Sequence, residues 1–502
     1  MQRAAWHLIL HVCTALALCS TASWAASGPT WPCRVDGIPN EVQCGSVRRP
    51  LDPARADGVQ IDVHYLVVPA MARNKRPDAV LLLAGGPGQS AIAIAPMMLP
   101  GLTRLNNQRD LVFIDQRGTG KSAPLQCPDD KTLPLQDALN SQRQLARLRS
   151  CMDSLLRLPH GDLRQYTTTL AMQDIDAVRA HLGYTQWNLI GASYGTRAAL
   201  EYQRQFPSHV RRTVLDGVAP ADMALPTSFS ADGQAALEAL FKACEADAAP
   251  GANHDARVHC GARLPHLRQE WQTLLAGLPR TVQVTHPVTG ALESLTLERD
   301  TLLRAVRLPL YSPVLTSALP EAIHAAAQGR FTPLLGLSSS LGSGKAMRLF
   351  TGMHFSVVCA EDLPRLDAPG HLPAGADFGD SDARWYRSVC DFWPRAAVEP
   401  AFYTLARAAS PVLLLSGGAD PATPPRHGER VAQALGAQAQ HLVIPQAGHG
   451  VMQLGCMREV VARFITAPEG QTLVQDARCA SGIPRPAVFV PTQPRAASGD
   501  AS

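Results

Sequence analysis

The 502-residue sequence lacks three features, and each absence argues against a class of protein. It has no basic run and a net charge of only +4, so nucleic acid is not an expected partner. After its N-terminus it has no apolar run of the roughly 18 residues that span a bilayer, so we expect no stable membrane insertion. It has no C-x-x-C pair, which argues against a zinc cluster or a thioredoxin-like redox site, and we expect no metal or other cofactor.

The first residues have the composition of a secretory signal. Arg3 precedes a mostly apolar segment at residues 4–18, and small residues end at Ala25. We therefore predict a signal peptide at residues 1–25 and export to a periplasm or out of the cell. Residues 16–19 resemble a lipoprotein cleavage site, but Leu18 is bulky where a small residue is needed, so lipidation is not expected.

Cleavage after Ala25 would remove two of the 12 cysteines, and the even number that remains indicates disulfides in an exported chain. The sequence permits many pairings, and the simplest one joins sequence neighbours. The predicted couples are Cys33 with Cys44, Cys127 with Cys151, Cys244 with Cys260, Cys359 with Cys390, and Cys456 with Cys479.

Short strand and helix patterns alternate in the first part of the chain. The predicted strands are residues 59–68, 79–84, 111–114, 187–190 and 212–218, and the predicted helices between them include 169–182 and 196–206. This alternation predicts an α/β fold in which a mostly parallel central sheet is covered by helices on both faces.

Mostly helical patterns follow from about residue 226, with a predicted hairpin at residues 281–297. Strand patterns return at residues 411–415 and 441–444, before a closing helix at 452–465. We therefore predict five segments. They are the signal at 1–25, the first part of the sheet core at 26–225, a large and mainly helical cap insertion at 226–400, the second part of the core at 401–482, and a disordered tail at 483–502.

Three polar residues that follow separate predicted strands are candidates for catalysis. Ser193 lies in Gly191-x-Ser193-x-Gly195, on a sharp turn from strand to helix that the two glycines make possible. Asp420 and His449 follow the last two predicted strands. Because the carboxyl ends of parallel strands share one rim, the three can meet, and their order is that of an α/β-hydrolase. Each alone could mark a mere turn or loop, so the joint pattern carries the prediction.

A serine hydroxyl needs a base to become a nucleophile at neutral pH. We expect His449 to take the proton of Ser193 and to return it to the leaving group. Asp420 would hold the imidazole in the required tautomer and stabilise its positive form.

Two glycine-containing loops, at residues 85–88 and 115–122, follow predicted strands. The glycine-rich turn at residues 85–88 follows a buried strand; it could be only a tight loop, but we predict that the backbone N–H groups of Gly86 and Tyr194 hold the oxyanion. Residues 115–122 end in Gly-Lys-Ser like a phosphate-binding loop. However, Asp115 stands where the first glycine would be, and prolines follow instead of a helix. We interpret this segment as a structural turn.

Taken together, the motifs resemble the prolyl aminopeptidase branch of the α/β-hydrolases and its longer, exported relatives, the tripeptidyl aminopeptidases of bacteria (TAP-like). The resemblance covers roughly residues 44–479. Its motifs are Gly85-Gly86-Pro87-Gly88, Asp115-Gln116-Arg117-Gly118-x-Gly120-x-Ser122, Gly191-x-Ser193-Tyr194-Gly195, Leu215-Asp216-Gly217-Val218, Cys359-Ala360-Glu361-Asp362, Asp420-Pro421-Ala422-Thr423-Pro424 and Gly448-His449-Gly450.

The resemblance implies a serine peptidase that releases short units, either single residues or proline-containing di- or tripeptides, from the free N-terminus of a peptide. The substrate ammonium then needs an anion, and Glu361 and Asp362 are the candidates; the same pair could also be a solvated turn or acids at a helix start. Ala84 stands where prolyl aminopeptidases usually carry histidine, and the insertion is larger. Both departures argue against strict proline specificity.

Two other functions fit the sequence. One is an exported carboxylesterase or lipase-like hydrolase with the same triad, and the other is a catalytically silent binding protein that retains the fold. Haloalkane or epoxide chemistry would need an aspartate in place of Ser193. The sequence does not indicate the oligomeric state.

Overall fold

The computed structural model describes residues 28–247, 259–340, 348–366, 376–471, 474 and 476–489. The predicted signal peptide and residues 490–502 of the predicted tail lie outside the described residues. Residues 483–489 of the predicted tail are among the described residues. Ile483 packs against the sheet core, and the N–H of Phe489 donates to the carbonyl of Ser317 at 2.9 Å.

Nine strands of the described chain form one sheet in the order β1-β2-β3-β5-β4-β6-β7-β10-β11. Strands β5, β4, β6, β7, β10 and β11 run parallel to one another. Strands β1, β2 and β3 are antiparallel additions at one edge. The bounds are β1 (Trp31–Cys33), β2 (Val42–Pro50), β3 (Gln60–Val68), β4 (Ala79–Leu83), β5 (Leu111–Ile114), β6 (Trp187–Ala192), β7 (Val210–Asp216), β10 (Val412–Gly417) and β11 (Ala439–Ile444).

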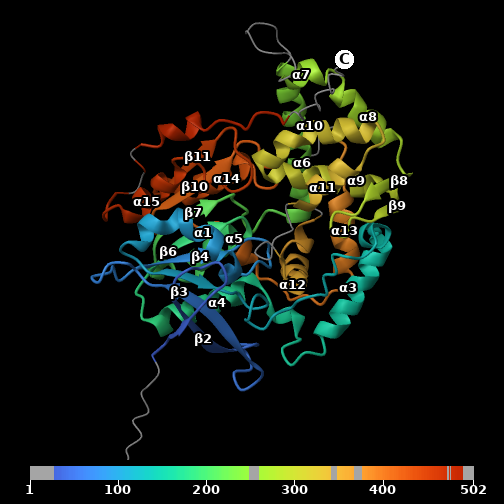
Figure 1. Cartoon of the computed structure of the whole chain (residues 1–502). Coiled ribbons are helices and arrows are strands. Elements are labelled where there is room, and N and C mark those ends of the chain that lie inside the picture. Colours follow the sequence, from blue (N-terminus) through green and yellow to red (C-terminus); the bar gives the residue numbers. More distant parts are fainter. Residues whose placement is uncertain are drawn as a thin grey trace, which may run out of the picture.

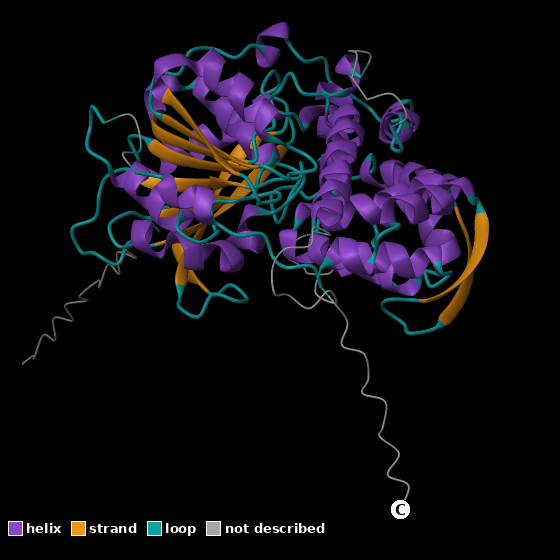
Figure 2. Ribbon diagram, turned by 90° about the horizontal axis from the view of Figure 1, so that it is seen from above, coloured by secondary structure: helices purple, strands orange, loops and turns teal. Residues whose placement is uncertain are grey.

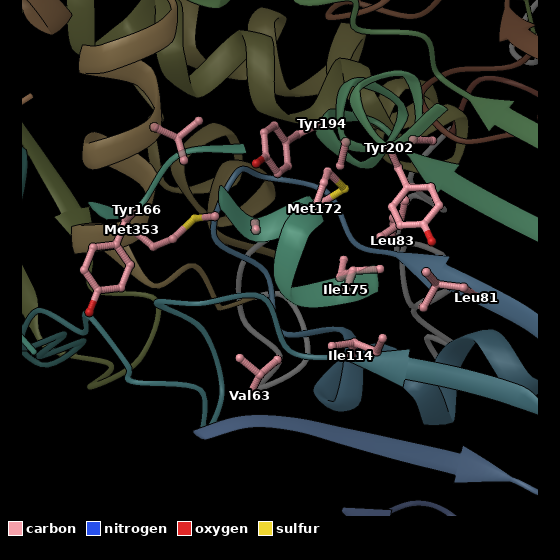
Figure 3. Close-up of a cluster of buried hydrophobic side chains, with 14 of the residues drawn as sticks. Val63, Leu81, Leu83, Ile114, Tyr166, Met172, Ile175, Tyr194, Tyr202 and Met353 are labelled. Carbon is pink, nitrogen blue, oxygen red and sulfur yellow. The ribbon is translucent and has the colours of Figure 1, made fainter. Parts of the chain in front are cut away.

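The central strands are buried on both faces because helices cover both (Figure 2). Alternate residues of β4 illustrate this: Leu81 and Leu83 belong to one hydrophobic cluster, and Val80 and Leu82 to another. Figure 3 shows the first cluster, in which Leu81 and Leu83 lie near Ile175. The helices contributing to this first cluster include α4 (Thr168–Leu182), α5 (Tyr194–Gln205) and α14 (Pro425–Leu435), whereas α1 (Ala91–Asn106) and α15 (Met457–Thr466) contribute to the second.

The chain between β7 and β10 forms a mainly helical unit beside the sheet (Figure 1). Much of it has its own hydrophobic cluster, built around residues such as Trp271 and Phe331. Its elements are α6 (Leu225–Ala246), α7 (Cys260–Arg263), α8 (Leu267–Ala276), the hairpin of β8 (Arg280–Thr285) and β9 (Leu292–Leu297), α9 (Arg299–Arg307), α10 (Pro313–Ala327), α11 (Thr332–Ser340), α12 (Thr351–Glu361) and α13 (Ser381–Cys390). This confirms the predicted α/β-hydrolase fold with a large helical insertion.

Five disulfides join the predicted couples, with Cα–Cα distances from 4.9 to 6.5 Å. Some helices were not predicted from the sequence. Helix α1 contains Pro96 and Pro100, which obscure a helical pattern, and neither α2 (Leu135–Leu139) nor the largely exposed α3 (Ser141–Leu155) was expected.

Candidate active site

Ser193 is the single residue between the end of β6 and the start of α5, and it has a strained conformation with φ of 56°. A non-glycine residue in this region costs about 1–3 kcal/mol and is held there by its surroundings. A Cβ on Gly195 would overlap the carbonyl oxygen of Leu83, and one on Gly191 would overlap the carbonyl of Gly195. Gly195 therefore lets the start of α5 approach β4, and Gly191 lets it approach the end of β6, closely enough to form the turn.

His449 and Asp420 form a hydrogen-bonded pair, with His449 Nδ1 donating to Asp420 Oδ2 at 2.8 Å. Asp420 Oδ1 accepts from the N–H groups of Ala422 and Thr423 at 2.8 and 2.9 Å, and the Thr423 hydroxyl donates to Oδ2 at 2.7 Å. Burial alone would raise the pKa of Asp420, but the charge and hydrogen bond of His449 outweigh it, so the pKa is lowered. Burial would lower the pKa of His449, and Asp420 raises it above 6.5 instead. The pair is therefore arranged to hold a protonated imidazole.

Asp216, at the end of β7, connects the serine turn to the histidine loop. Its carbonyl accepts from the N–H of Ser193 at 2.8 Å, and its carboxylate accepts from the N–H groups of Val451 and Met452 at 2.8 and 2.9 Å. A Cβ on the next residue, Gly217, would lie 3.1 Å from His449 Cε1. The structure thus brings Ser193 and the His449 loop together at one rim. The sequence reasoning included Asp216 in a motif but gave it no role.

The residues of the predicted oxyanion hole flank Ser193. A Cβ on Gly85 would lie 3.2 Å from Ser193 Cβ, which places Gly86 beside the serine turn. Tyr194 opens α5, where backbone N–H groups have no acceptor within the helix. Its buried hydroxyl is hydrogen-bonded to Thr168 Oγ1 at 2.7 Å, which fixes the side chain. The catalytic roles of these residues stay predictions.

The helical insertion contacts the candidate site through Tyr311, which sequence reasoning missed. The Tyr311 carbonyl accepts from the N–H of His449 at 2.9 Å, and its ring meets the imidazole edge-on with centroids 5.1 Å apart. Arg307 Nη1 donates to the Tyr311 hydroxyl at 3.3 Å. No motif marks Tyr311, because its contact with His449 exists only after the insertion has folded onto the rim.

Glu361 and Asp362, predicted to bind the substrate ammonium, lie in a buried cluster around Arg197. Asp362 accepts from Arg197 Nη1 and Nη2 at 3.0 Å each, and Glu361 accepts from Arg197 Nη1 at 3.4 Å. The N–H and hydroxyl of Thr168 donate to Glu361 at 2.7 and 2.9 Å. Burial raises the pKa of Glu361 to about 7, against the opposing charge of Arg197. Both carboxylates therefore already have a cationic partner, which the sequence did not indicate, and their predicted role stays a prediction.

The turn at residues 115–122 connects neighbouring elements, as expected. Asp115 accepts from the Ser90 hydroxyl at 2.6 Å, and Arg117 is fully buried and donates through Nε to Asp174 at 2.7 Å. Within the described residues, no helix is both long and apolar enough to cross a bilayer.

Comparisons with known proteins agree with the fold. Residues 78–316 match the model of the alpha/beta hydrolase fold, and residues 377–479 match that of TAP-like proteins. The chain is 27% identical to a tripeptidyl aminopeptidase of Streptomyces lividans, over 93% of this chain and 89% of that protein. It is 24% identical to the serine protease Hip1 of Mycobacterium tuberculosis, over 89% and 90%, and 27% identical to a carboxylesterase B of the same species, over 79% and 78%.

Solved structures are more distant. A proline iminopeptidase of Mycobacterium smegmatis is 15% identical with a TM-score of 0.34, covering 84% of this chain and 97% of its own. A meta-cleavage product hydrolase of Pseudomonas fluorescens is 13% identical with a TM-score of 0.37, covering 81% and 94%. The two family models and the sheet topology carry the assignment: the chain belongs to the α/β-hydrolase family, and its residues 377–479 match the TAP-like proteins of that family.

Proposed function

We propose that the protein is an exported serine aminopeptidase that releases short N-terminal units, either single residues or proline-containing di- or tripeptides, through a Ser193–His449–Asp420 triad. The observation that carries the proposal is the hydrogen-bonded His449–Asp420 pair, whose histidine loop is linked through Asp216 to the strained Ser193 turn. Similarity to a tripeptidyl aminopeptidase over most of both chains supports the choice of a peptide with a free N-terminus.

In the proposed mechanism, His449 takes the proton of Ser193 as its Oγ attacks the carbonyl carbon of the substrate. The pKa of His449, which Asp420 raises, favours the imidazolium that forms at this moment. The N–H groups of Gly86 and Tyr194 hold the oxyanion, and each such donor is typically worth about 3–4 kcal/mol of barrier. The imidazolium then protonates the leaving amine, and water hydrolyses the acyl-enzyme by the same steps.

The proposed ammonium site is the cluster of Glu361 and Asp362. Two carboxylates face one guanidinium there, so a cluster with both ionised carries a net negative charge that a second cation would offset. The cost of keeping Glu361 ionised is visible in its pKa, which burial raises to about 7, and a nearby ammonium would reduce that cost.

An esterase is the second candidate, and the similarity to a protein named carboxylesterase B favours it. A catalytically silent binding protein is a third. The ordered triad pair and the strained serine turn would have no evident use in such a protein.

The deciding experiment is mass spectrometry of the products from matched peptides with free and acetylated N-termini and with proline at each of the first three positions. We expect cleavage of free-amine peptides only, and the product length gives the number of residues released. The S193A variant is the control and should be inactive. Equal cleavage of acetylated peptides, or hydrolysis of simple esters alone, would leave the triad intact and remove the aminopeptidase assignment. Failure of Ser193 to react with a fluorophosphonate would support the binding protein.

Export is also part of the proposal. The five disulfides support it, because such bonds persist in oxidising compartments. N-terminal sequencing of the protein recovered from the periplasm or medium should show a chain that begins shortly after Ala25.

A further inference from the structure

The insertion also contacts the loop that carries Gly86. We call residues 85–88 the oxyanion loop. The N–H of Phe350, just before α12, donates to the carbonyl of Gly88 at 2.8 Å. Gly88 has φ of 105°, and a Cβ there would lie 2.9 Å from the Phe350 carbonyl, so the two backbones meet without an intervening side chain. The start of α12 therefore lies directly against the oxyanion loop.

One side chain of α12, that of His354, holds this loop by a hydrogen bond. His354 Nδ1 lies 3.0 Å from the carbonyl oxygen of Pro87, and its Nε2 lies 2.9 Å from the hydroxyl of Tyr386 in α13. A carbonyl oxygen only accepts, so Nδ1 carries the proton and donates. Burial lowers the pKa of His354, so the ring is neutral and its Nε2 accepts from the Tyr386 hydroxyl. The two hydrogen bonds thus form a chain of donors: the Tyr386 hydroxyl donates to His354, and His354 donates to the carbonyl of Pro87.

The two helices that carry this chain are fixed to one another. The disulfide Cys359–Cys390 joins α12 to α13, and both cysteines are buried. Phe355 packs against Tyr386 with ring centroids 5.8 Å apart. The donors therefore come from a rigid pair of helices, which is the arrangement that a precise position of the oxyanion loop needs.

We propose that His354, held by Tyr386, is a positioning residue that sets the direction of the Gly86 N–H toward the oxyanion. The proposal rests on the proposed catalytic function of Ser193. Pro87 has no N–H of its own, and its carbonyl belongs to the peptide that joins Pro87 to Gly88, so His354 can fix the oxyanion loop one residue after Gly86. Losing that donor would leave the carbonyl free to turn, and small displacements of catalytic groups are costly.

The test uses p-nitrophenyl acetate, which needs the oxyanion hole but no peptide specificity. H354F should lower kcat about 10- to 100-fold with KM nearly unchanged, which is less than the loss of a whole oxyanion donor. Y386F, which removes only a hydroxyl, should give a smaller loss in kcat of the same kind. H354N keeps a donor near Pro87 and should recover part of kcat. The control is H286F. His286 is also buried in the insertion; its Nε2 lies 3.1 Å from the carbonyl of Leu133, and its Nδ1 accepts from the N–H groups of Val288 and Thr289 between β8 and β9.

A second readout separates positioning from a loss of folding. The tripeptide aldehyde Ala-Pro-alaninal forms a bond from its carbonyl carbon to Ser193 Oγ; the carbonyl oxygen takes the π electrons and becomes an oxyanion, while the serine proton moves to His449. The matching alcohol, Ala-Pro-alaninol, forms no such adduct. H354F should weaken aldehyde inhibition about 10-fold or more and leave alcohol inhibition unchanged.

The outcomes distinguish this proposal from the proposed function. If the wild type reacts with a fluorophosphonate at Ser193 while H354F and Y386F keep wild-type kcat, or lose affinity for aldehyde and alcohol equally, the positioning role is refuted alone. If the wild type neither labels at Ser193 nor hydrolyses the ester, the proposed function fails and this proposal fails with it.

Discussion

Replacing Asp420 by asparagine should abolish most activity by imposing the wrong tautomer on His449. In the structure, Asp420 Oδ1 accepts from two backbone N–H groups, those of Ala422 and Thr423, so an asparagine must place its oxygen there. Its NH₂ group then occupies the position of Oδ2, the atom to which His449 Nδ1 now donates. Because the NH₂ group is a donor, Nδ1 must accept and Nε2 must carry the proton. An Nε2 that carries a proton cannot take the proton of Ser193.

We expect D420N to lower kcat/KM on a cleaved peptide about 10⁴-fold, which corresponds to about 5 kcal/mol of barrier. The fold should be retained, because the two backbone donors keep their acceptor. Circular dichroism and the thermal midpoint check this. T423V is the matched control. It removes the hydroxyl that donates to Oδ2 but leaves the carboxylate and its bond to His449, so its loss should be far smaller. A folded D420N enzyme that keeps more than roughly a tenth of wild-type kcat/KM would refute the tautomer reasoning.

Three further predictions follow from the site. The acid limb of the kcat/KM profile should lie above pH 6.5, because Asp420 raises the pKa of His449 and the base is lost when His449 is protonated. D420N should move this limb to lower pH. A limb that does not move would contradict the role of Asp420. D216A leaves the buried N–H groups of Val451 and Met452 unpaired. It should therefore lower the free energy of unfolding by about 2–5 kcal/mol in urea titrations, and it should also lower kcat. Unchanged stability would contradict the role of Asp216 in holding the His449 loop. E361Q should weaken cleavage of free-amine peptides more than that of p-nitrophenyl acetate, and equal losses would leave Glu361 only its structural contacts.

The sequence by itself determined the central strands, because apolar runs ending in glycine-rich turns are local signals. β5 begins and ends at the predicted residues, and β4 and β10 lie within one or two residues of prediction. The serine motif was readable for the same reason, since Gly191 and Gly195 are required by a backbone contact that any sequence must satisfy at this turn. The disulfide couples were found because each closes a short loop.

Only the tertiary structure decided which polar groups act together across long sequence separations. The carboxylate of Asp216 meets the N–H groups after His449, and Glu361 meets Thr168 and Arg197, through contacts that leave no trace in local composition. Tyr311, His354 and Tyr386 belong to helices whose patterns indicate burial alone. Their contacts with the histidine and oxyanion loops depend on how the insertion folds onto the carboxyl rim of the sheet, which the packing of whole elements sets.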